Sequence, residues 1–151
     1  MIREVVQVGD PVLRTKCEKV TRFDDELCAL LDDMKETVRK EEGAGLAAPQ
    51  VGVPIRAVVV DVVEGFFELI NPVFVWQKGE QSGVEGCLSV RGKAGTVTRP
   101  SKVKIVYQDR KGDKYALVAR DFFARAVCHE IDHLDGILYT DKAKNMRDSE
   151  D

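Results

Sequence analysis

Hydrophobic residues recur at helical spacing early in the chain, between Asp24 and Glu41. Positions three or four apart share one face of a helix, so this spacing predicts one amphipathic helix over residues 24–41. Thr21 or Asp24 can cap its start, and Gly43 can end it. The apolar positions are Leu27, Leu30, Leu31, Met34 and Val38.

Three later segments have the composition or alternation of β-strands. Residues 55–63 are rich in β-branched side chains. Residues 66–76 indicate a further strand or pair of strands, interrupted by Asn71 and Pro72. Residues 102–107 alternate polar and apolar side chains, as a half-buried strand does.

The last third of the chain predicts a hairpin and then a second helix. Residues 115–118 are the expected partner of the 102–107 strand, joined to it by a short turn. Asp121 is the expected cap of a helix that runs through Leu134, and Gly136 stops this helix. The residues that share one face of it are Phe122, Ala126, His129 and His133.

Composition is that of an ordinary globular domain. The 151 residues suffice for one domain with its own core, with 44% hydrophobic and 32% charged residues. The net charge is −3 and no basic stripe is visible, so nucleic acid is not an expected partner. We find no secretory signal and no apolar run long enough to span a membrane. Four widely spaced cysteines do not resemble a disulfide framework, which favours a reducing cytoplasm.

The segment from Cys128 to His133 carries the strongest chemical signal. It contains the chain's two histidines, four positions apart, with Glu130 directly after the first. On a helix both imidazoles share one face and can hold one metal ion, while the carboxylate is near enough to handle protons on a bound water. The simpler interpretation is a surface helix with coincidental spacing.

A catalytic metal site also needs a third protein ligand and an open position. No histidine remains and the downstream carboxylates are poorly placed, so the cysteines are the candidates. Cys17 lies in a charged segment, Cys28 lies within the first predicted helix, and Cys128 points about 100° away from the neighbouring histidine. Cys87 lies in the glycine-flanked loop 85–89, before a strand. We take it as the third ligand, the alternative being a buried, inert thiol.

Residues 43–50 read Gly-Ala-Gly-Leu-Ala-Ala-Pro-Gln. The two glycines leave bare backbone that another extended chain can approach closely. Gln50 offers a neutral amide donor for negative charge that develops on a carbonyl oxygen. The segment follows a helix and lacks a Gly-Lys-Ser/Thr ending, so it is not a phosphate loop. The plainer interpretation of Gln50 is an amide that satisfies local backbone.

Three motifs in this order resemble those of the peptide deformylase family. They are Gly-x-Gly-Leu-Ala-Ala-x-Gln at 43–50, Glu-Gly-Cys-Leu-Ser at 85–89 and His-Glu-x-x-His at 129–133. Segments 10–14 and 133–141 are also similar to that family, so the likeness covers nearly the whole chain. Each motif alone is moderately specific, and the three together are highly specific.

The resemblance implies a hydrolase that removes the formyl group from the N-terminal formyl-methionine of new polypeptides and releases formate. It implies that Glu130 takes a proton from a metal-bound water and later gives one to the leaving amine. Gln50 and the backbone N–H of Leu88 would hold the oxyanion. The implied metal ligands are Cys87, His129 and His133. The implied substrate-binding residues are Gly45, Ala44, Gly86, Phe122, Ala126 and Arg91.

In that reading the substrate backbone adds to a sheet edge beside Gly45, and an apolar pocket with Phe122 and Ala126 takes the methionine side chain. One divalent metal ion is implied, ferrous iron in the cell, with zinc, nickel or cobalt able to replace it. The Cys-His-His donor set alone favours zinc. We further expect a monomer without membrane or nucleic-acid partners, located in the cytoplasm. A host cytoplasm, for a virus-encoded protein, or an organelle is the alternative location.

Two features depart from the family pattern. After Ser89 many members have a proline and, soon after, an arginine that contacts substrate, whereas residues 90–95 here read Val-Arg-Gly-Lys-Ala-Gly. Arg91 is the expected substitute for that arginine. Many bacterial members also carry a longer C-terminal helix that docks at the ribosome. This chain ends at Asp151, so we expect only transient proximity to the ribosome and a frayed, charged tail over 142–151.

Two other functions fit parts of the sequence. A zinc peptidase could use the same helix, although no third histidine or well-placed glutamate supports it. A non-catalytic, metal-stabilised peptide-binding domain would suit the unusual residues 90–95. The expected fold is α+β, with antiparallel sheets packed around the central metal-binding helix and the 24–41 helix outside. We expect a single catalytic domain over residues 1–151.

Overall fold

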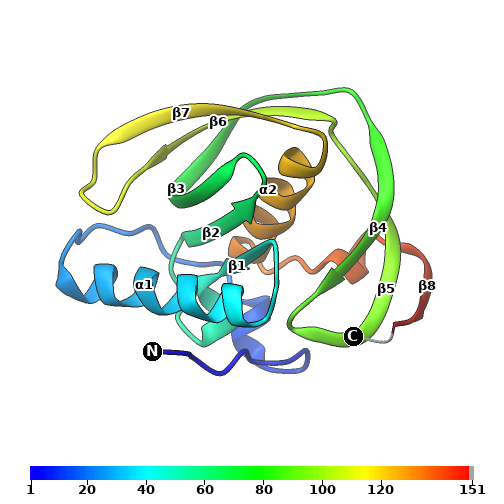
Figure 1. Cartoon of the computed structure of the whole chain (residues 1–151), viewed down its shortest axis with the longest axis horizontal. Coiled ribbons are helices and arrows are strands. Elements are labelled where there is room, and N and C mark those ends of the chain that lie inside the picture. The colour runs from blue at the N-terminus through cyan, green and yellow to red at the C-terminus, as the bar shows by residue number, and fades with distance from the viewer. Residues whose placement is uncertain (150–151) are drawn as a thin grey trace.

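The computed structural model describes residues 1–149 (Figure 1). Its α-helices are α1 (Asp25–Lys40) and α2 (Asp121–Leu134), and its short 3-10 helices lie at Pro11–Arg14, Ala48–Val51 and Tyr139–Asp141. Its strands are β1 (Gly45–Ala47), β2 (Ala57–Val62), β3 (Gly65–Lys78), β4 (Gln81–Cys87), β5 (Val90–Arg99), β6 (Lys102–Gln108), β7 (Lys114–Arg120) and β8 (Lys144–Asp148).

The strands form two antiparallel sheets that curve around α2 (Figure 1). The larger sheet has the order β1-β2-β3-β6-β7, and the smaller has the order β4-β5-β8. β1 and β4 are therefore edge strands, one in each sheet. The predicted α+β class, with antiparallel sheets around a central helix and the first helix outside, is confirmed. Within the described residues, no helix is both long enough and apolar enough to cross a membrane.

The larger sheet is buried on both faces at β2. Side chains alternate along a strand, so Val58 and Val60 pack with α2 while Ala57 and Val59 pack with α1. Burial on both faces explains the uninterrupted apolar run in the sequence. The α2 residues in the same hydrophobic cluster as Val58 and Val60 are Phe123, Ala124, Ala126, Val127, Cys128, Ile131 and Leu134.

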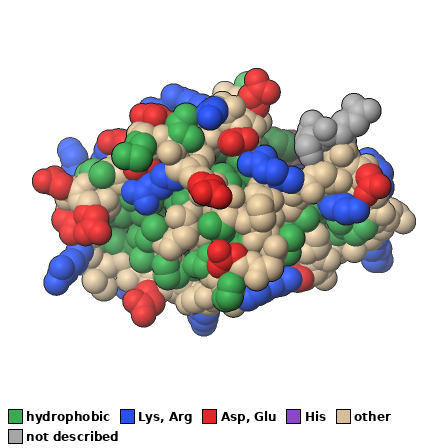
Figure 2. All heavy atoms as spheres, turned by 90° about the horizontal axis from the view of Figure 1, so that it is seen from below, with side chains coloured by type: hydrophobic (Ala, Val, Ile, Leu, Met, Phe, Trp, Pro, Cys, Tyr) green, Lys and Arg blue, Asp and Glu red, His purple; other side chains and the backbone are tan. Residues whose placement is uncertain are grey.

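Charged side chains of both signs are interspersed over the face seen in Figure 2.

Helix α1 begins where its sequence pattern indicates. Of the two candidate caps, Asp24 is the one used, and its carboxylate accepts a hydrogen bond from the Leu27 N–H at 3.1 Å. The end differs from the expectation. The helix stops at Lys40, and Glu42 rather than Gly43 takes the left-handed conformation, with φ of 55°. The N–H of Gly43 still closes the turn by donating to the Val38 carbonyl at 2.9 Å.

The expected break at Asn71-Pro72 is a bulge inside one long strand rather than a gap between two. Asn71 has a φ of 51°, and the pairing of β3 with β6 shifts register just after Ile70. The Asn71 amide forms two hydrogen bonds with the backbone of Val20, accepting at 2.8 Å and donating at 2.9 Å. This side chain thus replaces backbone pairing lost at the bulge.

Asp121 does not cap α2 as expected. It is the first residue of the helix, has a φ of 55°, and no side chain caps this end. Its backbone N–H donates instead to the carbonyl of Ser101, the residue before β6, at 2.8 Å. The other end follows the prediction. Gly136 has a φ of 74°, and the N–H of Ile137 donates to the Asp132 carbonyl at 3.0 Å, as in a Schellman motif.

Of the smaller sheet, only the strand after residues 85–89 was predicted, and that strand is β5. Strands β4 and β5 are rich in glycine and polar residues, so local propensity gives little sign of them. The expectation of a frayed, charged tail over 142–151 is wrong for Lys144–Asp148, because this segment forms strand β8 against β5. Backbone pairing with β5 orders this segment despite its polar side chains. Residues 150 and 151 of that expected tail lie outside the described residues.

Replacing Gly136 by alanine should destabilise the fold strongly. The new Cβ would lie 2.6 Å from the carbonyl oxygen of Arg14, at a backbone conformation that disfavours side chains. Gly52 is the matched control, since it has a φ of 84° but no heavy atom within 4 Å of its Cβ position. We expect Gly52→Ala to cost about 1–2 kcal/mol, and Gly136→Ala about 1–3 kcal/mol more. Urea unfolding measures both, and equal losses would contradict the close contact.

Candidate metal centre

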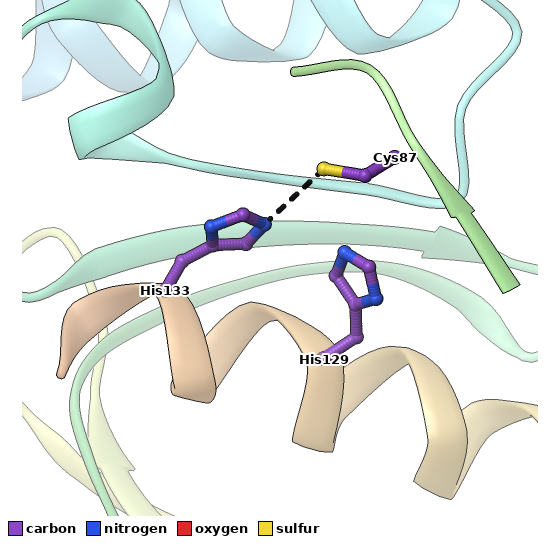
Figure 3. Close-up of side chains that lie close together, drawn as sticks. All are labelled: Cys87, His129 and His133. Carbon is purple, nitrogen blue, oxygen red and sulfur yellow. Dashed lines mark hydrogen bonds between the residues drawn. The ribbon is translucent and has the colours of Figure 1, made fainter. Parts of the chain in front are cut away.

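Three side chains from two elements converge at one point. His129 and His133 project from α2 toward Cys87 (Figure 3). Their ligand atoms all lie within 4.8 Å of one another, and Cys87 Sγ is 3.5 Å from His133 Nε2. The two imidazoles lie with ring centroids 5.1 Å apart, as expected for positions i and i+4 of a helix. The donor set of one thiol and two imidazoles can hold one metal ion.

Cys87 is placed differently from the expectation. It is the last residue of β4, paired with Val90 across a two-residue turn, and not part of an irregular loop. Gln7, which sequence reasoning missed, supports this turn because its amide donates to the Leu88 carbonyl at 2.9 Å. The position of the thiol is therefore determined by strand pairing and by the N-terminal segment.

The other cysteines do not join the site. Cys17 and Cys128 are buried and Cys28 is half-buried. Burial raises the pKa of both Cys17 and Cys128 to about 11, so both thiols stay protonated at neutral pH. Neither Cys17 nor Cys128 is thus placed or ionised as a ligand.

A buried carboxylate orients the first imidazole. Glu85 Oε1 accepts a hydrogen bond from His129 Nδ1 at 2.8 Å, which turns Nε2 toward Cys87. Glu85 also accepts two bonds of 3.0 Å from Arg99 and one of 2.6 Å from Arg125. Burial alone would raise the pKa of Glu85, but hydrogen bonds from His129 and Arg99 outweigh it and lower the pKa to about 2. The carboxylate is therefore permanently ionised.

The network continues from Arg99 across α2. Arg99 Nη1 donates to Asp132 Oδ2 at 2.6 Å, and Lys142 lies 3.1 Å from the same oxygen. Asp132 is therefore paired with two cations. The motif residue between the two histidines thus anchors the helix to β5 through Arg99.

The two imidazoles differ in protonation. Burial, together with the nearby His129, lowers the pKa of His133 well below its ordinary value, so its ring is neutral and its nitrogen can bind a cation. Burial also lowers the pKa of His129, but hydrogen bonds to Cys87 and Glu85 outweigh it and raise the pKa to about 10. Positive charge is favoured at this point, and a metal ion can take the place of the proton.

Glu130 is buried beside the ligand set, at 5% exposure. Burial raises its pKa to about 7, and its Oε1 has no hydrogen-bond partner among the described residues. The carboxyl group lies directly against Gly45, because a Cβ added there would be 2.7 Å from Glu130 Oε2. Gly45 thus leaves room for a carboxyl group whose free oxygen can reach a water or a substrate.

Gln50 lies beside the thiol of Cys87. Its Nε2 donates to Ser89 Oγ at 3.0 Å and lies 3.5 Å from Cys87 Sγ. Its Oε1 accepts from the Ala47 N–H at 2.9 Å, so the plainer interpretation of a locally bonded amide holds for the oxygen. The NH2 group is consequently fixed beside the cysteine. Ser89, which fixes it, belongs to the 85–89 motif, but the sequence assigned it no role.

A cavity of about 590 Å³ opens over these residues. It includes every substrate-binding residue that the sequence suggested, namely Gly45, Ala44, Gly86, Phe122, Ala126 and Arg91. The cavity is less apolar than expected, because the buried guanidinium group of Arg125 also lines it and Phe122 is 58% exposed. Arg125 was missed because arginine on a helix is usually solvated.

These features define an α+β protein with a His-Glu-x-x-His helix and a cysteine that completes a metal-binding group. The sequence model of the family described as Polypeptide deformylase matches residues 2–149. The chain belongs to this family and is an enzyme of it. A peptide deformylase from Caldanaerobacter subterraneus subsp. tengcongensis is 51% identical over 150 residues, which cover 99% of this chain and 94% of the relative.

Solved structures agree with the sequence comparison. Peptide deformylase from Thermotoga maritima has a TM-score of 0.93 at 35% identity, covering 95% of this chain and 99% of that one. The enzyme from Synechococcus elongatus in complex with actinonin has a TM-score of 0.91 at 38% identity, covering 95% and 79%. The peptidase and non-catalytic alternatives do not account for this likeness.

Replacing Glu85 by glutamine should destabilise the protein far more than a matched surface change. The substitution leaves the buried Arg125 without its carboxylate partner and removes one of the two anions of the buried Arg99, which costs about 3–5 kcal/mol. Glu68 is the control, since it binds Arg110 at a site where the arginine is 31% exposed and has a second partner in Asp32. We expect about 1 kcal/mol or less for Glu68→Gln. Similar urea midpoints for the two variants would contradict a structural role for Glu85.

Proposed function

We propose that this enzyme hydrolyses the formamide at the N-terminus of formyl-methionyl polypeptides, releasing formate and a free amino terminus. The observation that carries the proposal is the buried carboxyl group of Glu130, which has an unpartnered oxygen and lies in a cavity beside three converging metal-ligand atoms. Likeness to proteins named peptide deformylase supports the reaction class.

The residues fit a metal ion, and we propose Cys87, His129 and His133 as its ligands. Glu85 holds one imidazole in the required orientation, and the neutral second imidazole offers a lone pair. When bound, a divalent cation lowers the pKa of water to about 7 and polarises a carbonyl group. We propose ferrous iron in the cell, with zinc, nickel or cobalt as replacements.

Glu130 is the proposed general base and acid. Its pKa of about 7 suits both roles, because near neutral pH the carboxylate can accept a proton from the attacking water and later return it to the leaving amine. The contact with Gly45 holds the carboxyl group over the cavity. No other described carboxylate has an unpartnered buried oxygen.

The proposed oxyanion hole consists of the Gln50 amide and the Leu88 N–H. Negative charge develops on the formyl oxygen as water adds, and fixed donors stabilise it without reorganisation. Ser89 and Ala47 hold the Gln50 amide in one orientation beside Cys87. The turn between β4 and β5 carries Leu88 next to the same thiol. Both donors are thus pre-positioned by hydrogen bonds and strand pairing.

The peptide is proposed to bind as an added strand. β1 and β4 are free sheet edges, and residues of both, Gly45 and Gly86, line the same cavity. An extended backbone can pair with such edges while alternate side chains enter pockets. We propose that Phe122 and Ala126 contact the methionine side chain, and that Arg91 contacts later residues.

One chain suffices for this scheme. Every residue given a role lies between Ala44 and His133, which supports a single catalytic domain over residues 1–151 acting as a monomer. The substrate is a product of translation, so the proposed place of action is the compartment where formylated peptides are made, the cytoplasm or an organelle. Its encounter with the ribosome would be transient.

Replacing Glu130 by glutamine should abolish most activity without loss of metal. Removing a general base costs about 10²–10⁴-fold in rate, while the ligand atoms remain. The measurement is formate release from formyl-Met-Ala-Ser by protein loaded anaerobically with ferrous iron, with metal content determined in parallel. Glu64→Gln, at an exposed turn residue, is the control and should match the wild type. Wild-type turnover by Glu130→Gln would contradict the assignment.

A further inference from the structure

Residues 142–149, which we call the C-terminal strap, run along β5 with β8 as their central part (Figure 1). Lys93 of β5 lies opposite Asp148, and these two side chains form an ion pair. All five side chains of β8 are exposed, and neither of the two large hydrophobic clusters contains a strap residue. The strap therefore adds little to the main core, and its contacts with β5 call for another explanation.

Gly95 of β5 is matched to the strap. A Cβ added at Gly95 would press on Met146 Sδ and would lie 2.9 Å from the Cβ of Ala143. The next nearest atom is the carbonyl oxygen of Lys144, at 3.4 Å. All three atoms belong to the strap. The lack of a side chain at this one position is what lets the strap lie so close to β5.

Both ends of the strap are also attached. Lys142 forms an ion pair of 3.1 Å with Asp132, which lies between the two histidines of α2. At the other end, the Ser149 N–H donates to the Gly92 carbonyl at 2.8 Å. The strap thus spans from the metal-binding helix to the tip of the β4–β5 hairpin.

The hairpin segment that the strap covers is one wall of the active-site cavity. The lining residues on this side are Arg91, Gly92, Lys93, Ala94 and, from the strap itself, Ser149. Residues 41–45 also line the cavity, and Glu41 forms an ion pair of 3.5 Å with Arg91. We propose that the C-terminal strap is a positioning element for peptide binding, which holds the β5 wall at the separation that a bound peptide needs. This inference rests on the proposed function and extends it to a segment that supplies none of the proposed metal ligands.

The strap is proposed to affect peptide binding and not the hydrolysis step. Strand β4 carries Cys87, Glu85 orients His129 and apolar contacts pack α2, and to these the strap adds only the half-exposed Lys142–Asp132 ion pair. Releasing the strap should therefore raise KM while kcat stays near the wild-type value. A change of this kind removes binding that is shared by ground state and transition state.

The test uses the full chain with Gly95→Ala, a change whose new methyl group meets only strap atoms. We expect the strap to detach, which is measured as faster trypsin cleavage after Lys142, Lys144 or Arg147, followed by intact mass. For formyl-Met-Ala-Ser we expect KM to rise about fivefold or more with kcat within about twofold. Adding Ala143→Gly and Met146→Ala removes the obstructing atoms, so the triple variant should regain both trypsin resistance and KM.

A second variant disturbs the strap near its C-terminal end. Asp148→Lys places an ammonium group against Lys93, and like charges opposite each other in a sheet repel. We expect the same pair of effects, faster cleavage and higher KM. Strap release without a rise in KM, or cleavage at the wild-type rate in both variants, would overturn the proposal. A fall in kcat of more than tenfold with unchanged KM would also overturn it.

The wild-type activity distinguishes failure of the proposed function from failure of the strap proposal. Wild-type protein with bound metal and no formate release would contradict the deformylase assignment, whatever the strap variants do. An active wild type whose KM is insensitive to strap release would contradict the positioning role alone.

Discussion

The buried carboxylate of Glu85 is the interaction on which the rest of the site depends. It lies on β4 and binds Arg99 of β5 together with Arg125 and His129 of α2. One side chain therefore joins the smaller sheet to the central helix and orients a proposed metal ligand. Within residues 1–149, the buried Arg125 would have no carboxylate partner without it and Arg99 would keep only Asp132, so the anion, its cations and the imidazole form one unit. The thiol of Cys87, two residues along the same strand, is positioned by the same attachment.

The proposed active site lies beside the edge strands of both sheets. β1 ends the larger sheet and β4 ends the smaller one, and the cavity includes residues from both. Free strand edges expose unpaired backbone groups, which is a liability in most proteins. Here the edges border the cavity, and the helix α2 below them carries His129, Glu130 and His133. The fold thus places the proposed peptide-binding edges next to the candidate metal ligands.

Local patterns in the sequence were sufficient for α1, for α2 and for the pair of histidines, because helical spacing depends on neighbours within one turn. Cys87 was found by elimination, but its place at a strand end was not. The network around Glu85 could not be predicted, since its partners lie 14, 40 and 44 positions away along the chain. β4 and β8 lack strand-forming composition and are ordered by pairing with β5. Asp121 shows the reverse case, in which a good local cap is overridden by a tertiary hydrogen bond to Ser101.

The central claim is that β4 brings one thiolate to two imidazoles of α2 so that all three bind the same ion. X-ray absorption at the zinc edge, on protein carrying one zinc per chain, tests this most directly. The account predicts one sulfur scatterer at about 2.3 Å and two histidine nitrogens at about 2.0–2.1 Å, with the sulfur absent in Cys87→Ser. A spectrum with no sulfur neighbour, or one unchanged by Cys87→Ser, would contradict it.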